Sequence, residues 1–251
     1  MGRRRVSQVL TPRALPRFFV PKHALEELTL PDEVVHHARQ VLRLRAGDWV
    51  CLLSGEGEVY LAQLGKEPHR IQQVVPNALE TELPLEVSIL QSLVPADKAE
   101  VVVRLCVQGG AHAIHFAPSA RSIVRWEPEK QARYATRWQK IAQEEAALAC
   151  RARLTRVHLW DNWQQAFTQL PRPVLVLDEW EGTLPLKQRC RRMPMPETLS
   201  IVVGPEGGFS PNERAWLQAQ PETYAVSLGA RVLRTESAAF YALAQLSTLW
   251  E

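Results

Sequence analysis

The sequence predicts an α/β protein in which a small β-rich domain precedes a larger domain with a mainly parallel sheet and helices on both faces. Two observations support this prediction. Residues 16–83 contain short, closely spaced strand patterns separated by turn signals, which is typical of a small β-barrel. Residues 84–251 alternate strand-length apolar runs with longer helical patterns, which is typical of a parallel sheet covered by helices.

The composition bounds the function. At 251 residues the chain has room for two domains, and its net charge of +3 is too small to indicate a nucleic-acid-binding protein by itself. No apolar run reaches the roughly 18 residues of a membrane helix, and the first residues lack the apolar segment of a signal peptide. The four cysteines form no C-x-x-C pair. We therefore expect a cytoplasmic protein without a membrane partner, a disulfide framework or a metal.

The first domain is expected to follow a basic tail. Residues 1–15 carry several arginines without periodicity, and either contact RNA or have no role. Short apolar runs predict strands at 17–20, 49–53, 59–64 and 70–75. The residues Ser54-Gly55-Glu56-Gly57 predict a hairpin between the second and third strands.

One helix is expected to interrupt these strands. Asp32 can act as its N-cap. Its apolar face is expected to comprise Val34, Val35, Ala38, Val41 and Leu42. A small barrel of this kind commonly binds RNA, and Arg43 and Arg45 beside the following turn either contact phosphate or remain solvated.

The second domain is expected to begin after a polar, proline-bearing boundary at 80–84. Its strands are expected at 87–91, 113–117, 156–159, 174–177, 199–203 and 226–228. Its helices are expected at 98–108, with Asp97 as N-cap, and at 129–150, 162–170 and 235–249, with a further helix starting at Pro211.

The stretch around Gly204 carries the clearest local signal. An apolar run at 199–203 ends at Gly204-Pro205-Glu206-Gly207-Gly208, and Ser210-Pro211-Asn212-Glu213 forms a capping box that starts a helix. The turn matches neither the P-loop nor the dinucleotide-binding glycine motif, and Glu206 would repel a phosphate. It is either a purely structural turn or a binding site for a neutral or cationic ligand.

Two other segments are expected to join this turn. Asp178-Glu179-Trp180-Glu181 follows the strand at 174–177, and the residues from Gly229 to Glu236 follow the strand at 226–228. Ligands of open α/β sheets bind outside the carboxyl ends of the strands. These three turns therefore predict one site for a polar, cationic small molecule.

Together these motifs resemble the RsmE family of RNA uracil-N3 methyltransferases, which belongs to the SPOUT superfamily. Gly204-Pro205-Glu206-Gly207-Gly208 and the segment from Ser227 to Ala238 resemble its two C-terminal signatures. The similarity extends over nearly the whole chain, through Arg17-Phe18-Phe19-Val20, Val41 to Asp48, Asp97-Lys98, Ser119 to Arg125, Arg137 to Ile141 and Arg151.

The resemblance implies a PUA-like barrel, a SPOUT methyltransferase domain with a C-terminal trefoil knot, and a homodimer. It further implies S-adenosylmethionine as cofactor and 16S rRNA as substrate, within the small ribosomal subunit. By position, the expected cofactor-binding residues are Leu177, Glu179, Gly204, Glu206, Gly207, Gly208, Leu228, Gly229 and Leu233. A methyl sulfonium is cationic, so an acidic turn suits it where it would not suit a phosphate.

Basic residues of both domains are candidates for RNA binding. On the helix at 129–150, Lys130, Arg133, Arg137 and Lys140 share one face, which is either a solvated surface or part of a patch that follows the RNA backbone. The expected RNA-binding residues are Arg17, Arg43, Arg121, Arg125, Arg137 and Arg151.

Two residues are candidates for catalysis. Arg234 could stabilise the negative charge that develops on the uracil carbonyl oxygens, and Glu236 could orient Arg234 or act as base. The two side chains could instead form a structural ion pair. Two other functions remain open: a ribose 2′-O-methyltransferase of the same superfamily, and a non-catalytic RNA-binding or assembly factor.

Overall fold

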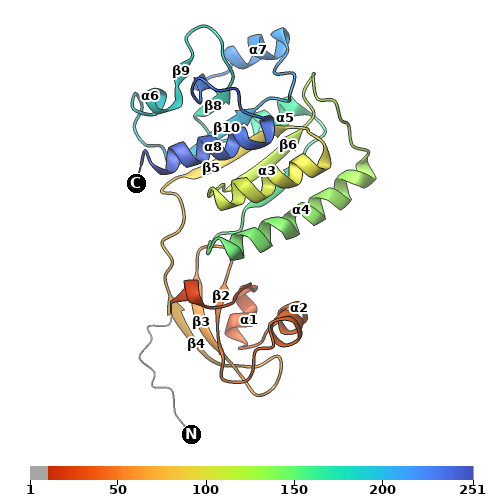
Figure 1. Ribbon diagram of the computed structural model, residues 1–251, viewed down its shortest axis with the longest axis vertical. Helices are drawn as coiled ribbons and strands as arrows, with labels where there is room; N and C mark the ends of the chain where they lie inside the picture. Colours follow the sequence, from red (N-terminus) through yellow and green to blue (C-terminus); the bar gives the residue numbers. More distant parts are fainter. Residues whose placement is uncertain (1–10, 251) are drawn as a thin grey trace. The chain divides into compact units, whose positions relative to one another are not determined.

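The computed structural model describes residues 11–250, which form two units (Figure 1). One unit comprises the chain up to Thr81 together with the returning segment Ala147–Leu154. The other comprises Glu82–Ala146 and the chain from Thr155 onward. The basic tail expected at 1–15 falls mostly outside the described residues. Within the described residues, no helix is both long and apolar enough to cross a membrane.

The first unit is built on a four-stranded sheet with the order β1-β2-β3-β4. Its strands are β1 (Arg17–Phe19), β2 (Trp49–Leu53), β3 (Val59–Leu64) and β4 (Ile71–Asn77). The β1–β2 pair is parallel and the others are antiparallel, so the hairpin expected at 54–57 is confirmed. Short helices accompany the sheet: η1 (Pro12–Ala14), α1 (Lys22–Glu26), α2 (Asp32–His36) and the π-turn η2 (His37–Val41).

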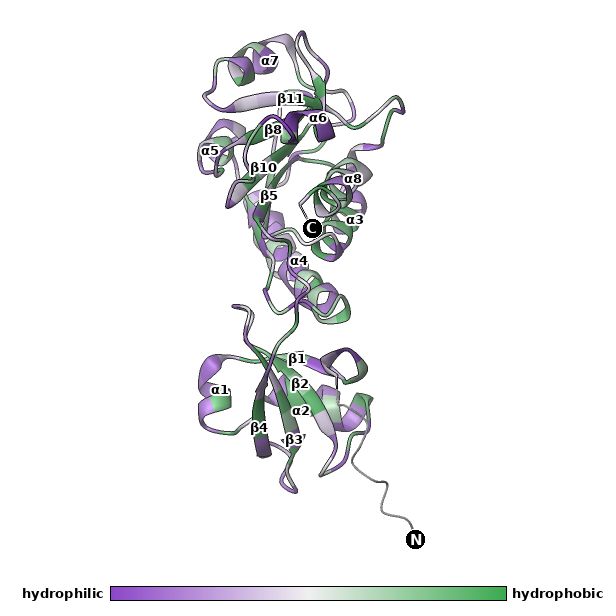
Figure 2. Ribbon diagram, turned by 90° about the vertical axis from the view of Figure 1, so that its left-hand side faces the viewer, coloured by the Kyte–Doolittle hydropathy of each residue, from purple (hydrophilic) through white to green (hydrophobic). Residues whose placement is uncertain are grey.

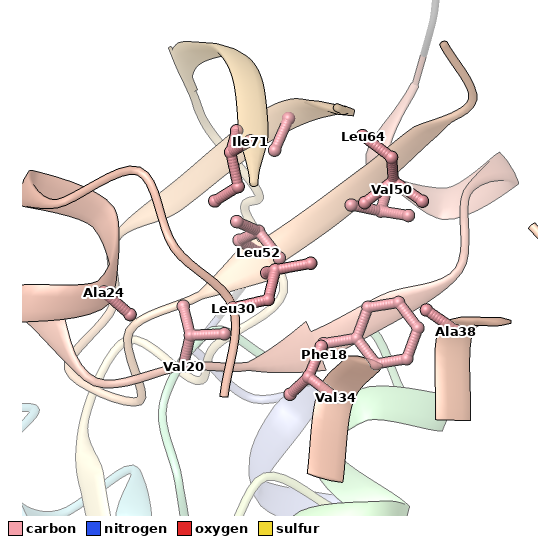
Figure 3. Packing of buried hydrophobic residues seen from close by; sticks show 11 residues of the cluster. Phe18, Val20, Ala24, Leu30, Val34, Ala38, Val50, Leu52, Leu64 and Ile71 are labelled. Atoms are coloured by element: carbon pink, nitrogen blue, oxygen red, sulfur yellow. The ribbon is translucent and has the colours of Figure 1, made fainter. Parts of the chain in front are cut away.

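The core of this unit lies between one face of the sheet and the short helices. Phe18 and Leu52 from the sheet meet Val34 and Ala38 from the helical segment, and all four are buried (Figure 3). The returning segment packs on the other face, where Ala152 lies in a cluster with Cys51, Leu53, Val59 and Leu61.

Two details of the helix expected at Asp32 are corrected. The N-cap is Pro31, and Asp32 is the first helical residue, whose Oδ1 lies 2.8 Å from His69 Nε2. Val41 and Leu42 are 58% and 43% exposed rather than part of the apolar face. The π-turn η2 explains this exposure because its wider hydrogen-bond spacing turns the residues that follow away from the face of Val34 and Ala38.

The second unit is built on a seven-stranded sheet with the order β7-β6-β5-β10-β8-β11-β9, in which every pairing is parallel. Its strands are β5 (Glu86–Ser92), β6 (Ala113–Ala117), β7 (Arg156–Leu159), β8 (Val174–Leu177), β9 (Leu184–Pro185), β10 (Thr198–Val203) and β11 (Thr223–Ser227). Buried Ile89, Leu90, Ile201 and Val202 fill its central strands, as expected where both faces are covered.

Helices cover both faces of this sheet, which confirms the predicted fold class. They are α3 (Ala96–Gln108), α4 (Pro128–Leu148), α5 (Trp163–Thr168), α6 (Leu186–Cys190), α7 (Pro211–Gln218) and α8 (Thr235–Ser247). Helices α3 and α8 pack against each other on one face, and α5 lies on the opposite face (Figure 2).

Most local predictions for this unit are confirmed. Strands β6, β7 and β8 have the expected bounds, and both hydrogen bonds of the Ser210–Glu213 capping box are present. The predicted cap Asp97 is wrong, because the N-cap is Pro95 and α3 already begins at Ala96. The short elements β9 and α6 were not expected from the sequence.

Candidate active site

Three adjacent strands bring the expected turns to one edge of the sheet. Val203 of β10 is paired with Leu177 of β8, and Leu177 with Val226 of β11. The three strands are parallel, so the turns that follow them leave the sheet side by side. The predicted convergence is therefore present in the structure.

The β10 turn is fixed by glycine and by a cap. A Cβ on Gly204 would lie 3.2 Å from the ring of buried Phe209, so this position favours glycine. Gly208 has φ +64°, with open space around the position of a Cβ. The carboxylate of Glu213 accepts hydrogen bonds from Ser210 N at 2.8 Å and Ala120 N at 2.7 Å, which ties the turn to the segment after β6.

Glu206, in the middle of this turn, is paired with Lys98 of α3. Lys98 Nζ donates to Glu206 Oε1 at 2.8 Å, and each side chain is about one-third exposed. Partial burial raises the pKa of Glu206, but hydrogen bonds from Lys98 and the backbone outweigh it and leave that pKa below the ordinary value. The hydrogen bond to Glu206 raises the pKa of Lys98. The charge of Glu206 is thus balanced by a residue for which the sequence indicated no site role.

The β8 turn is held in place by an ion pair with α7. Arg214 donates to both carboxylate oxygens of Asp178, through Nε at 2.7 Å and Nη2 at 2.8 Å. This two-point pairing leaves the next residue, Glu179, exposed, with Oε1 3.5 Å from Ser227 Oγ of β11. The first two turns are therefore oriented by side chains outside the predicted site.

The β11 turn is open to solvent. Gly229 has φ +120°, and no heavy atom lies within 4 Å of the position of a Cβ. Leu228 and Leu233 are half-buried, and Val232 is fully exposed. Gln245 of α8 donates to Leu228 O at 3.3 Å, so the turn is anchored at its start.

The start of α8 joins the β11 turn to the β10 turn through Thr235. Thr235 Oγ1 donates to Gly204 O at 2.7 Å and accepts from Gln91 Nε2 of β5 at 2.8 Å. This chain of hydrogen bonds is buried. Gln91 and Thr235 are therefore supporting residues that the sequence did not single out.

The two expected catalytic residues flank Thr235. Arg234 Nη1 lies 3.8 Å from Glu236 Oε1. The Arg234 side chain is 85% exposed, while that of Glu236 is only 13% exposed. Glu236 Oε2 is buried without a hydrogen-bond partner among the described residues. An accessible guanidinium thus lies next to a carboxylate with an unused acceptor oxygen.

The expected RNA-binding arginines occupy different environments. Arg43 and Arg137 are exposed, and Arg137 Nε is paired with Glu100 Oε1 at 2.7 Å. Arg17 is half-buried and donates to backbone carbonyls, including Ala147 O at 2.5 Å. Arg151 is only 3% exposed, so we do not retain it among the residues proposed to contact RNA.

Arg121 and Arg125 lie on the segment that follows β6. Arg121 is exposed, and its Nη1 donates to Gly207 O at 3.0 Å, within the turn predicted to bind the cofactor. Arg125 donates to the carbonyls of Ser119, Ser122 and Val124. Of the two, Arg121 is the expected RNA-binding residue that contacts a predicted cofactor-binding turn, whereas Arg125 holds its own segment.

The site fits S-adenosylmethionine better than it fits a metal. The glycines at 208 and 229 leave open space where backbone can approach a ligand, and half-buried leucines at 177, 228 and 233 offer apolar surface to an adenine ring. Among residues 11–250 no group of three or more histidine, cysteine, aspartate or glutamate side chains is arranged to hold a metal ion.

Comparisons with known proteins agree with this geometry. Residues 81–247 match an RNA methyltransferase domain, and residues 30–72 match an RNA methyltransferase PUA domain. The chain is 30% identical to ribosomal RNA small subunit methyltransferase E of Bacillus subtilis over 247 residues, which cover 93% of this chain and 96% of that protein. The enzyme of the same name from Synechocystis is also 30% identical, over 92% of this chain and 76% of its own length.

A solved structure carries the cofactor. Ribosomal RNA small subunit methyltransferase E of Neisseria gonorrhoeae, bound to S-adenosyl methionine, is 28% identical to this chain and superposes with a TM-score of 0.76. The match covers 94% of this chain and 98% of that structure.

Proposed function

The chain belongs to the RNA methyltransferase family that includes the ribosomal RNA small subunit methyltransferases E, and we propose that it methylates N3 of a uridine in 16S rRNA. The methyl donor is S-adenosylmethionine. The observation that carries this proposal is the meeting of three turns at one sheet edge, with the Arg234–Glu236 pair beside them.

Cofactor binding is assigned to these turns. The residues that would hold S-adenosylmethionine are Leu177, Glu179, Gly204, Glu206, Gly207, Gly208, Leu228, Gly229 and Leu233. When bound, S-adenosylmethionine supplies an electrophilic methyl group. Because Glu206 is already paired with Lys98, we assign it the role of holding the turn. The exposed Glu179, whose Oε1 has a long contact of 3.5 Å with Ser227 Oγ, is the carboxylate assigned to meet a polar group of the cofactor.

The chemistry is assigned to Arg234 and Glu236. Methylation at N3 requires loss of the imide proton, and negative charge then develops on the two uracil carbonyl oxygens. The exposed guanidinium of Arg234 can stabilise that charge without changing its own protonation state. Glu236 either orients Arg234 through its Oε1 or accepts the proton on its unpaired Oε2.

RNA binding is assigned to both units. The first unit, with Arg43, would serve as a PUA-like RNA-binding domain, and Arg121, Arg125 and Arg137 would bind the backbone near the site. Arg17 would support the first unit through its bonds to carbonyl oxygens. We further propose a homodimer, a C-terminal trefoil knot and action in the cytoplasm on RNA within the small ribosomal subunit, as the family resemblance implies.

The proposal is tested by a methylation assay on small-subunit RNA, both free and assembled into subunits, with the modified nucleoside identified by mass spectrometry. N3-methyluridine is the expected product. A 2′-O-methylated nucleoside would instead assign the chain to ribose methylation. Failure of the protein to bind S-adenosylmethionine in calorimetry would favour a non-catalytic RNA-binding role.

A further inference from the structure

A pocket lies beside the turns assigned to the cofactor. Its volume is about 470 Å³, and it is lined by the segment after β6, the first turn of α5 and the start of α7. None of the residues expected to bind the cofactor lines it. The hydrogen bonds from Ala120 N to Glu213 and from Arg121 to Gly207 O tie one wall of this pocket to the β10 turn.

The charges around the pocket disfavour an anion. The N-terminus of α7 would ordinarily attract a phosphate, but the negatively charged Glu213 lines the pocket there, and its carboxylate accepts the N–H groups of Ser210 and of Ala120. Arg125 also lines the pocket and keeps its positive charge, because its three hydrogen bonds to carbonyl oxygens do not neutralise it. The negative charge of Glu213 offsets the positive charge of Arg125 in the pocket lining, and this favours an uncharged, polar ligand.

One polar group of the pocket has no partner. Trp163 lines it and is 3% exposed, and its indole Nε1 is buried without a hydrogen-bond acceptor among the described residues. An unsatisfied buried N–H is costly and therefore rare in a folded protein. The N–H itself is shielded from the open space of the pocket, so a ligand carbonyl oxygen or ring nitrogen would satisfy it only if the surrounding side chains shift to admit the ligand.

The remaining lining residues suit a planar heterocycle. Trp216 is half-buried, with its ring 5.7 Å from that of Trp163, and offers aromatic surface. Gln164 and Asn212 are exposed and carry amide donors and acceptors. Aromatic surface together with amide groups is how proteins hold unstacked RNA bases, and the pocket volume is within the usual range for small ligands.

We propose that this pocket binds one unstacked nucleobase of the RNA substrate, next to the uridine that is methylated. This inference rests on the proposed function, and it adds a second base-binding site that is separate from the cofactor turns. The base would accept a hydrogen bond from Trp163 and be read by Gln164 and Asn212. Its binding would fix which nucleotide reaches Arg234.

The test compares a pocket variant with a matched control. The pocket variant combines Gln164→Ala and Asn212→Ala, and the control combines Gln165→Ala and Gln218→Ala on the same two helices. Gln165 and Gln218 are exposed and do not line the pocket. A third protein, Trp163→Phe, keeps an aromatic ring but lacks the N–H. Each is titrated with a single-stranded RNA that contains the target uridine, and with copies that are abasic at one position at a time.

We expect one abasic position, other than the target, to weaken binding to the native chain about tenfold, as loss of a stacked base does. The pocket variant should bind the intact RNA about tenfold more weakly, and that abasic position should then have no further effect. Trp163→Phe should show part of this tenfold loss of RNA affinity, and the control should bind RNA as tightly as the native chain. Affinity for S-adenosylmethionine should be unchanged in all of them.

Two outcomes would overturn the pocket assignment. In one, the pocket variant keeps native RNA affinity and the native abasic profile. In the other, the pocket variant loses affinity equally at every abasic position and its salt dependence falls by about one phosphate contact, which would identify a phosphate site. Because these are binding measurements, absence of methylation by the native chain would overturn the proposed function without deciding the pocket.

Discussion

Lys98 Nζ lies 2.8 Å from Glu206 Oε1, so the first turn of α3 is joined to the turn that the sequence marks as the centre of the site. This pair places the acidic residue of the glycine turn against a lysine rather than leaving it unpaired. Glu206 therefore holds the turn in shape rather than attracting a cationic ligand by itself.

We predict that Lys98 and Glu206 act as one unit in cofactor binding. Lys98→Met and Glu206→Gln should each weaken S-adenosylmethionine binding about fivefold, and the double variant should bind no more weakly than either single variant. Calorimetric titration measures the dissociation constant of S-adenosylmethionine for each of the three variants. Lys130→Met, which changes an exposed lysine on α4, is the control and should bind normally. Strictly additive losses would show that the two residues act separately.

We predict that Arg234→Ala lowers the rate of methyl transfer by about 100- to 1,000-fold, the usual effect of removing one group that stabilises developing charge. The side chain is 85% exposed, so its loss should leave folding and cofactor affinity close to native. A single-turnover assay measures the rate of methyl transfer, and calorimetry measures the affinity for S-adenosylmethionine. Arg191→Ala, an exposed arginine after α6, is the control. A normal transfer rate in Arg234→Ala would remove this residue from the mechanism.

The sequence predicts a structural feature well when the residues that produce the feature are close together in the chain, and poorly when they are far apart. The Ser210–Glu213 cap spans four residues, and β8 is a short apolar run between turn signals, so both could be predicted. Thr235 contacts Gly204 over a separation of 31 residues, and that contact forms only when α8 returns to the sheet. Its local pattern predicts no more than the start of a helix.

The same distinction applies to the candidate site. The three turns could be predicted because their strands are apolar and parallel, whereas their supports, Lys98 and Arg214, come from other elements. Arg151 looks like a surface arginine in sequence, yet it is buried in the segment that returns to the first unit. The pocket at Trp163 also needs three separate segments. None of these arrangements has a periodic signal.

We predict that Gly229→Ala weakens S-adenosylmethionine binding at least tenfold. Gly229 has φ +120° in open space, so a methyl group there strains the backbone and occupies room beside the turns proposed to bind the cofactor. Gly47→Ala is a matched control, because Gly47 also has a positive φ, +91°, but lies in the other unit, where an added Cβ would lie 4.0 Å from Gln63 Nε2. Both variants should lose about 1–2 kcal/mol of unfolding free energy. Equal losses of cofactor affinity would refute a specific role for Gly229.

We predict that His115 makes the folded state less stable in acid. Burial lowers the pKa of His115 from 6.5 to about 4, with further contributions from His158 and His112, and Trp160 Nε1 donates to its Nδ1 at 3.0 Å. The folded protein therefore keeps this ring neutral where the unfolded chain already binds a proton. Its contribution to stability is complete above pH 6.5 and is lost as the pH falls toward 4, by about 3 kcal/mol in total.

Urea unfolding at a series of pH values isolates this effect when the native chain is compared with His115→Gln, which cannot titrate but still offers an acceptor to Trp160. The difference in unfolding free energy between the two proteins should be constant above pH 6.5 and should shift by about 3 kcal/mol in favour of the variant as the pH falls to 4. His158→Gln serves as the comparison, since burial and Arg156 also lower the pKa of His158, a more exposed ring stacked on His115. A difference that does not change with pH would mean that His115 is protonated equally in both states.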